Sequence, residues 1–301
     1  MLRLDRRAFL AVAATAPFAG AARAFDVPSQ PPLIERDYAL DRQSFRSHLL
    51  RRGPSPDDVE PLTPPAGARR LPYASGDLAL TAWRSAPAKP GTGKQPAVLF
   101  LHGGNSLGSG HWLLALPYVL AGYVVMMPAV RGENGQAGAF SGFYDETDDV
   151  IAAAHVLAAQ PDVDAGRLFV AGHSVGGTLS LLAAMSSPIF RGAASFSGNP
   201  SAFAFFQHFP EDIRFDASDR REFEMRSAIC YATSFKCPML LLHGEAESRL
   251  TEPSALTAGR ARAAGLSAES AVVAGDHNSA LPEEAIRSLA FFARLSGKVT
   301  G

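Results

Sequence analysis

Short, unbroken apolar runs alternate with amphipathic stretches from residue 97 to residue 295. An apolar run of about five residues is typical of a strand that is buried on both faces of a sheet. Strands that alternate with helices at this spacing form βαβ units with right-handed crossovers. The sequence therefore predicts an α/β fold, with a mostly parallel central sheet and helices on both of its faces. Strands are expected at 97–101, 123–127, 167–171, 193–197, 239–242 and 270–274, and helices at 112–121, 145–159, 174–186, 253–264 and 282–295.

Two segments before residue 97 lie outside this alternation. Strand-like residues flank Ser75-Gly76-Asp77 within residues 69–83, which predicts a β-hairpin. Residues 25–66 are rich in proline and charge, and we interpret them as an N-terminal arm that lies over one domain at 67–301. A short helix is expected in the arm, at about 42–51.

The first residues have the pattern of an export signal. Arg6 and Arg7 precede an alanine-rich apolar run at 8–22, and Ala22-Arg23-Ala24 offers a cleavage site between small residues. We predict a twin-arginine signal peptide at 1–24 and a periplasmic or secreted protein; the alternative is a retained amphipathic helix. Because the run is shorter than the roughly 20 residues that span a bilayer, no stable membrane anchor is expected.

Charge and cysteine content exclude several other classes. Lys and Arg number 28 against 29 Asp and Glu, which argues against a polybasic nucleic-acid-binding protein. Cys230 and Cys237 could form a disulfide in an oxidising compartment or remain buried thiols, and both alternatives stay open. Two cysteines with no histidine pair nearby do not predict a metal site. The oligomeric state does not follow from the sequence.

A nucleophile elbow is predicted between the strand at 167–171 and the helix that follows it. Gly172-His173-Ser174-Val175-Gly176 has the pattern G-x-S-x-G in the required strand–turn–helix context. Such a turn is so tight that a Cβ at either flanking glycine would clash, and it presents the serine hydroxyl beside a helix N-terminus that favours negative charge. Ser174 is the candidate nucleophile; an ordinary glycine-rich turn is the alternative.

The general base is expected after the nucleophile and the acid in the chain. Of the eight histidines, His277 alone lies beyond the last predicted strand, in a polar turn. His102, His173 and His243 each neighbour a glycine at a strand end and are predicted to support loop geometry. His48, His111, His155 and His208 are assigned to surface or packing roles.

The orienting acid is expected on the loop after strand 239–242. Glu247 is the first candidate and Glu245 the alternative. Asp276 adjoins His277 in sequence and is poorly placed to hold its ring. Asp212, Asp216 and Asp219 in the inserted segment 199–237 are weaker candidates.

The oxyanion hole requires two backbone N–H groups near the serine hydroxyl. One is expected from Val175, the residue after the nucleophile, and the other from the loop His102-Gly103-Gly104-Asn105. Gly104 is the first choice for the second donor and Asn105 the alternative.

These residues together resemble a known family from about residue 67 onward. His102-Gly103-Gly104, Arg131-Gly132-Glu133-Asn134-Gly135, the elbow at 172–177, His243-Gly244 with its acid, and His277 are similar to the α/β-hydrolases. The resemblance is narrower to the dienelactone-hydrolase-like and prolyl-oligopeptidase-like (peptidase family S9) serine hydrolases. It implies acyl transfer to water through a covalent intermediate on Ser174, without a metal or an organic cofactor.

Two features depart from that family. Relatives usually carry aspartate where this chain has Glu247, whose extra methylene requires a slightly different placement of the loop or the imidazole. Relatives of the peptidase type often carry an N-terminal propeller, and residues 25–66 are too few to form one.

The substrate pocket is expected under residues 199–237, which we interpret as a small helical cap over the carboxyl ends of the strands. Phe203, Phe206 and Tyr144 are the candidate substrate-binding residues, although an aromatic stripe is more often core. The 131–135 loop is either a structural loop with a buried Arg–Glu pair or a wall of that pocket. The cap contains seven phenylalanines, at positions 203, 205, 206, 209, 215, 223 and 235.

A serine hydrolase that cleaves an ester or amide (peptide) bond is therefore expected, with a small ester or a short peptide as substrate. The alternatives are carboxylesterase or dienelactone-hydrolase-like activity without peptidase activity and, in another class, a non-catalytic binding protein on a hydrolase scaffold.

Overall fold

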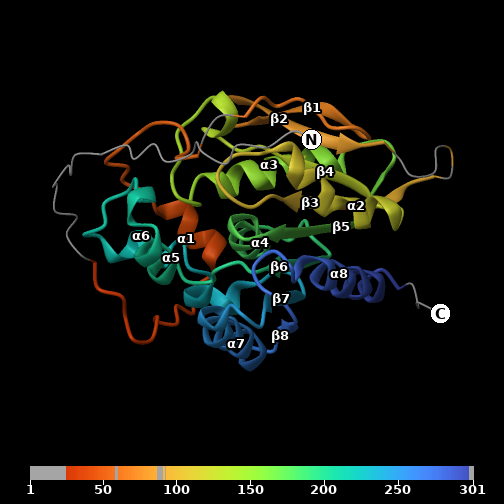
Figure 1. Cartoon of the computed structure of the whole chain (residues 1–301). Coiled ribbons are helices and arrows are strands. Elements are labelled where there is room, and N and C mark those ends of the chain that lie inside the picture. The colour runs from red at the N-terminus through yellow and green to blue at the C-terminus, as the bar shows by residue number, and fades with distance from the viewer. Residues whose placement is uncertain (1–24, 58–59, 87–90, 92, 298–301) are drawn as a thin grey trace, which may run out of the picture.

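The computed structural model describes residues 25–57, 60–86, 91 and 93–297, so the predicted export signal lies outside the described residues. An eight-stranded sheet forms its centre, in the order β1-β2-β4-β3-β5-β6-β7-β8 (Figure 1). β2 pairs antiparallel with both β1 and β4, and every other pair is parallel, as the alternating pattern predicted. The strands are β1 (Ala68–Ser75), β2 (Leu78–Ser85), β3 (Gln95–Leu101), β4 (Val124–Pro128), β5 (Val163–His173), β6 (Gly192–Phe196), β7 (Met239–Gly244) and β8 (Ala268–Val273).

The predicted hairpin is confirmed as β1 and β2. Ser75 lies opposite Leu78, which leaves Gly76 and Asp77 as the turn. Gly76 has a φ of +56°. The two-residue turns that commonly connect hairpin strands, types I′ and II′, require a positive φ at this first turn residue, which glycine adopts readily. The hairpin joins the sheet through β2, where Trp83 lies opposite Met127 of β4.

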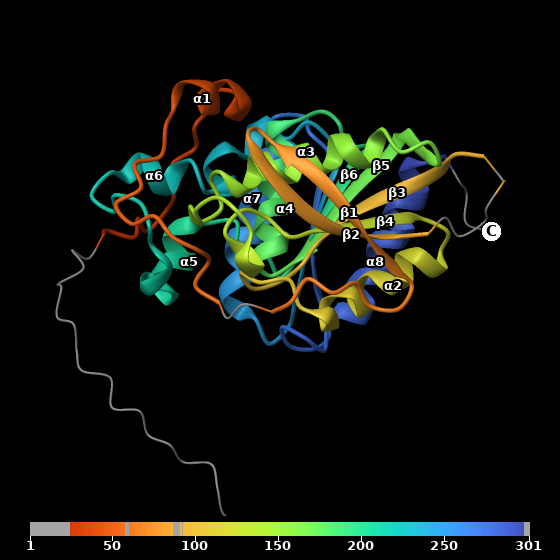
Figure 2. The ribbon, with the colours of Figure 1, turned by 90° about the horizontal axis from the view of Figure 1, so that it is seen from above.

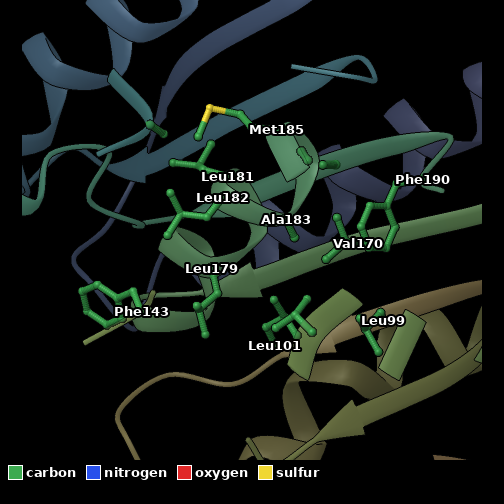
Figure 3. Packing of buried hydrophobic residues seen from close by; sticks show 14 of the residues in the cluster. Leu99, Leu101, Phe143, Val170, Leu179, Leu181, Leu182, Ala183, Met185 and Phe190 are labelled. Carbon is green, nitrogen blue, oxygen red and sulfur yellow. The ribbon is translucent and has the colours of Figure 1, made fainter. Parts of the chain in front are cut away.

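Helices cover both faces of the sheet, and alternate residues of β3 show the two sides. Leu99 and Leu101 belong to the core on the side of α3, α4 and α7, whereas Val98 and Phe100 belong to the core beneath α2 and α8. Figure 2 shows these helices on opposite sides of the strands, and Figure 3 shows Leu101 near Leu179 of α4. The helices are α2 (Trp112–Leu120), α3 (Glu146–Ala158), α4 (Val175–Ser186), α7 (Ser248–Ala263) and α8 (Leu281–Leu295).

The inserted segment 199–237 folds as short helices, and the arm lies beside it (Figures 1 and 2). The insertion contains α5 (Ala202–His208) and α6 (Arg220–Glu224), together with 3-10 turns at Pro210–Asp212 and Ala228–Ser234. Its fully buried Arg226 donates to Ser47 Oγ of the arm at 2.6 Å and forms an ion pair with the buried Glu222. Arm and insertion are therefore joined through buried polar contacts.

The helix predicted in the arm at about 42–51 is misplaced. The helix that forms is α1 (Tyr38–Ser44), which begins where the Asp37 side chain accepts a hydrogen bond from the Leu40 N–H at 3.1 Å. It ends at Phe45 because the following residues are extended against the cap, with Leu49 bridged to Phe215. A contact more than 160 residues away in sequence thus overrides local helical propensity.

Cys230 and Cys237 are both buried and free. Burial raises the pKa of each thiol to about 12, so both are protonated at neutral pH. Within the described residues, no helix is long and apolar enough to cross a bilayer.

Candidate active site

Ser174 occupies the turn between β5 and α4 in a strained conformation. Its φ of 55° and ψ of −117° lie outside the regions that non-glycine residues ordinarily adopt. The flanking glycines are required by space, because a Cβ on Gly172 would lie 2.3 Å from the carbonyl oxygen of Gly176, and one on Gly176 would lie 2.1 Å from that of Leu101. The strand–turn–helix context predicted for Ser174 is therefore present.

His277 and Glu247 meet at the carboxyl ends of the last two strands. His277, on the loop after β8, has its Nδ1 at 2.7 Å from Oε1 of Glu247. Glu247 follows β7 and is buried, and its Oε2 accepts hydrogen bonds from the Gly244 N–H at 3.0 Å and from the Ser197 hydroxyl. The structure brings Glu247 to His277, whereas Glu245 is exposed.

The environment of Glu247 keeps its carboxylate charged. Burial acts to raise the pKa of Glu247, but the hydrogen bonds from His277, Ser197 and Gly244 outweigh burial and lower the pKa to about 2. The carboxylate therefore remains an acceptor for the imidazole N–H throughout the neutral range.

A second histidine supports the loop of His277. The Nε2–H of His173 donates to the backbone carbonyl of His277 at 2.8 Å, and the two ring centroids are 4.5 Å apart. Burial, with a smaller contribution from His277, lowers the pKa of His173 to about 4, so this ring is neutral at pH 7. His173 thus supports loop geometry, as its place beside a strand-end glycine suggested.

Asp276 holds the same loop from its other side. Its carboxylate is exposed and accepts hydrogen bonds from the Ser279 hydroxyl and from the N–H groups of Asn278 and Ser279. These bonds close the turn that carries His277. The side chain is engaged within the turn, whereas the imidazole of His277 is held by Glu247.

Two backbone segments lie beside Ser174: the start of α4 and the loop after β3. The Val175 N–H is the first of α4, so no carbonyl of that helix accepts it. The loop after β3 runs directly against the serine, since a Cβ on Gly103 would lie 3.3 Å from the Ser174 Cβ. Gly104 has a φ of +68°, and the adjacent Asn105 N–H donates to Asp57 Oδ2 at 2.7 Å.

The Arg–Glu pair predicted within 131–135 does not form. Arg131 instead donates to Asp149 of α3, with Nη2 2.6 Å from Oδ1. Glu133 is buried and pairs with His102, whose Nε2 lies 3.1 Å from Oε2 of Glu133. The loop therefore has a structural role. Each of its two charged side chains pairs with a residue outside the loop, and the sequence of the loop does not reveal these partners.

Two hollows flank Ser174 and His277, and both residues line both hollows. The smaller, of about 190 Å³, lies beneath α5 and is bordered by Phe205 and Phe209. The larger, of about 620 Å³, is bordered by Asp57 of the arm.

The predicted pocket residues lie elsewhere. Phe203 and Phe206 are buried inside the cap, and the buried Tyr144 donates from its hydroxyl to the backbone carbonyls of Arg42 and Phe45. The aromatic side chains on the smaller hollow are those of Phe205, within α5, and Phe209, the residue that directly follows the helix. The sequence shows the four-residue spacing of Phe205 and Phe209, but it does not show which side of the helix faces Ser174.

The parallel sheet, the elbow at Ser174 and the His277–Glu247 pair define an α/β-hydrolase fold. A family model confirms and narrows this class: the Prolyl oligopeptidase family (Peptidase_S9) matches residues 113–294. The chain belongs to the prolyl oligopeptidase family.

The chain is also similar to individual proteins, to one in sequence and to two in fold. The uncharacterized peptidase YuxL of Bacillus subtilis is 30% identical over 200 residues, which are 60% of this chain and 30% of YuxL. An acylaminoacyl peptidase of Pyrococcus horikoshii superposes with a TM-score of 0.63 at 20% identity, over 77% of this chain and 42% of that one. A Klebsiella pneumoniae protein assigned as a dienelactone hydrolase superposes with a TM-score of 0.58 at 19% identity, over 75% of this chain and 98% of that one. The chain thus spans less than half the length of these two peptidases.

Proposed function

We propose that the protein is a serine hydrolase in which Ser174, His277 and Glu247 act as a catalytic triad. The observation that carries the proposal is the 2.7 Å contact between His277 Nδ1 and buried Glu247, on the same two hollows that the strained Ser174 borders. An ionised acceptor at Nδ1 holds that nitrogen protonated and leaves Nε2 free to accept a proton, which is the tautomer that a general base requires.

The reaction follows from these roles. Ser174 Oγ attacks the substrate carbonyl carbon while His277 Nε2 takes the hydroxyl proton, and Glu247 stabilises the imidazolium that results. The carbonyl oxygen becomes an oxyanion, for which the N–H groups of Val175 and Gly104 are the proposed donors. His277 returns the proton to the leaving group as the C–O or C–N bond breaks. Water then attacks the acyl carbon while His277 takes its proton, and His277 returns that proton to Ser174 Oγ as the acyl–Oγ bond breaks and the carboxylic acid is released.

Membership of a peptidase family supports amide or peptide bonds as the substrate class. The aromatic side chains of Phe205 and Phe209 on the smaller hollow favour an apolar or aromatic acyl group. The second candidate is an esterase without peptidase activity. It is favoured by the likeness to the Klebsiella protein, whose chain is covered almost completely.

A fluorophosphonate probe tests the proposal, because it reacts with an activated serine and reports no substrate preference. We expect labelling of the wild type and none of Ser174→Ala, strong loss in His277→Ala, and retained labelling in the surface control His155→Ala. An unlabelled wild-type protein would refute the hydrolase. Turnover of aminoacyl amides and matched esters by wild-type protein that has not been exposed to the probe then separates peptidase from esterase.

Export of the protein to the periplasm is a separate proposal, which rests on the sequence pattern of residues 1–24. We expect the mature chain in the periplasmic fraction to begin at Phe25, and Arg6→Lys with Arg7→Lys to retain the precursor in the cytoplasm. Mass spectrometry of the two fractions measures both, and an intact N-terminus in the periplasm would contradict cleavage at this site.

A further inference from the structure

Two carboxylates of the arm border the larger hollow beside Ser174, those of Asp57 and Glu60. Among the described residues, no lysine or arginine lines this hollow, whereas the smaller hollow is lined by Arg249 and by no carboxylate. A cation that enters the site is therefore attracted toward the larger hollow and repelled from the smaller one.

The two carboxylates are held in place because the arm is bonded to the loops around the site. Asp57 Oδ2 accepts a hydrogen bond from the Asn105 N–H at 2.7 Å, and the Ser55 hydroxyl donates to the carbonyl of Asn105. The backbone carbonyl of Glu60 accepts from Asn134 Nδ2 at 2.9 Å. Within the described ranges 25–57, 60–86, 91 and 93–297, no hydrogen bond or ion pair engages Asp57 Oδ1 or the Glu60 carboxylate. These oxygens are available to a ligand.

A third acceptor belongs to the side chain of His173, which is only 6% exposed. Its Nε2–H donates to the backbone carbonyl of His277, so Nδ1 of this neutral ring carries a lone pair. Nδ1 has no partner in the part of the chain that the structure describes, and it lies 3.1 Å from the position that a Cβ on Gly103 would take. His173 and Gly103 line the larger hollow and not the smaller one. A nearly buried nitrogen without a donor indicates a place for an N–H group of a ligand.

Glycines leave these acceptors uncovered. A Cβ on Gly104 would lie 3.1 Å from Asp57 Oδ2, and one on Gly108 would lie 2.8 Å from Glu60 Oε2. Both glycines belong, with Gly103, to the loop that follows β3. The three acceptors therefore lie along one loop, at positions where the loop itself has no side chain to cover them.

We propose that the larger hollow is a leaving-group subsite for a cation that carries N–H donors, either a primary ammonium or a guanidinium. Asp57 and Glu60 supply the opposite charge, and His173 Nδ1 accepts one hydrogen bond. The inference rests on the proposed function, in which the smaller hollow takes the apolar or aromatic acyl group and the departing group is left with the larger one. It narrows the substrate class to esters or amides whose released alcohol or amine bears a basic group.

Esters with one acyl group and different leaving groups test this subsite. The phenylacetate esters of 4-(aminomethyl)phenol and 4-(hydroxymethyl)phenol have similar size and differ in charge, and chromatography measures the phenol released. With the full chain, we expect the higher kcat/KM for the ammonium ester. Glu60→Gln should lower the ammonium-to-hydroxymethyl ratio of kcat/KM about threefold, and Glu60→Gln with Asp57→Asn about tenfold. Asparagine at position 57 can still accept from the Asn105 N–H, and any loss common to both esters cancels in the ratio.

Three controls make the result specific. Glu35→Gln, which removes an exposed carboxylate of the same arm that lines neither hollow, should leave the ratio unchanged. With the aminomethyl group on the acyl part instead, in the 4-nitrophenyl ester of 4-(aminomethyl)phenylacetic acid, Glu60→Gln should have no such effect. A trimethylammoniomethyl leaving group has the charge without N–H donors, and its preference over the uncharged 2,2-dimethylpropyl isostere should be smaller. Equal preferences for the two cations would overturn the role of His173.

The outcomes separate this subsite from the hydrolase itself. An equal ratio in wild type and the double variant, with Ser174-dependent turnover of the hydroxymethyl ester, would overturn the subsite and leave the hydrolase intact. If the wild type is labelled by fluorophosphonate but hydrolyses neither ester, 4-(aminomethyl)phenol should still slow labelling of the wild type more than of the double variant, and equal labelling rates would overturn the subsite. If the wild type is neither labelled nor active on the esters, both proposals are overturned.

Discussion

Glu284 lies fully buried in the first turn of α8, and neither of its carboxyl oxygens has a hydrogen-bond partner among the described residues. Burial, with a smaller contribution from the negative charge of Glu247, raises the pKa of Glu284 to about 8. The group is therefore a neutral acid at pH 7. Its protonation spares the fold an unpaired buried charge close to the acid of the proposed triad.

A glutamine at this position should remove a pH dependence of stability. Between the ordinary pKa of 4.5 and about 8, the unfolded chain releases the Glu284 proton while the folded protein keeps it. The free energy of unfolding contributed by this group therefore falls as the pH rises through that range and levels off above it. Relative to wild type, Glu284→Gln should gain roughly 2–4 kcal/mol between pH 5 and pH 8, measured by urea unfolding.

The neighbouring Glu283 is the matched control for Glu284. Its side chain is about half exposed, at 46%, and pairs with Arg287 one turn along α8, so Glu283→Gln should follow the wild-type pH profile. Parallel unfolding profiles for wild type and Glu284→Gln would show that the buried carboxyl does not hold its proton as inferred.

The two candidate acids on the loop after β7 should differ sharply in their effect on turnover. Glu247→Ala removes the acceptor at His277 Nδ1, and we expect kcat on a chromogenic ester to fall by about 10³- to 10⁴-fold. Glu245 is exposed, and Glu245→Ala should change kcat by less than about threefold. A comparable loss in Glu245→Ala would move the assignment of the acid.

Two phenylalanines at the two ends of α5 have different tasks, and mutation can separate them. Phe203 is buried and stacks on Phe223 with ring centroids 5.1 Å apart, whereas Phe209 is 43% exposed on the smaller hollow. Phe203→Ala should lower the free energy of unfolding by about 3–5 kcal/mol. Phe209→Ala should change it by less than about 1 kcal/mol while raising KM for an aromatic acyl ester several-fold.

Thermal unfolding and ester kinetics on the same preparations decide between these outcomes. If Phe209→Ala lost as much stability as Phe203→Ala at unchanged KM, α5 would be a packing element only.

Local patterns were sufficient for the parts of the molecule where chemistry and backbone geometry are set within a few residues. The apolar runs predicted every strand of the parallel sheet, and G-x-S-x-G predicted the turn at Ser174, because the steric demands of that turn are local. His277 was found by its place after the last strand. Parallel strands bring such carboxyl-terminal loops to one edge of a sheet.

Contacts between distant segments account for the expectations that differ from the structure. The position of α1 depends on the pairing of Leu49 with Phe215, and the partner of Arg131 is Asp149 on a different element. The face of α5 that borders the hollow depends on how the cap docks. Each of these is set by tertiary packing, which the periodicity of a single segment does not encode.

Arg226 joins three segments that lie far apart in the sequence, so its removal should be felt throughout the fold. Its guanidinium pairs with Glu222 at 2.5 Å and donates to Ser47 of the arm at 2.6 Å and to the Ser141 carbonyl at 2.8 Å. Both members of the ion pair are fully buried. Arg226→Met would leave the Glu222 carboxylate buried without a cation, and we expect the free energy of unfolding to fall by about 3–5 kcal/mol.

Urea unfolding of Arg226→Met should be read against a nearby exposed pair. Arg220 pairs with Glu224 within α6 at 3.0 Å and is more than half exposed, so Arg220→Met should cost less than about 1 kcal/mol. If the unpaired charge is the cause, the double change Arg226→Met with Glu222→Leu should recover much of the stability lost in the single variant. Equal losses in the single and double variants would instead assign the effect to the hydrogen bonds that Arg226 makes to the arm and to Ser141, and those bonds would then be what holds the arm and the cap on the catalytic domain.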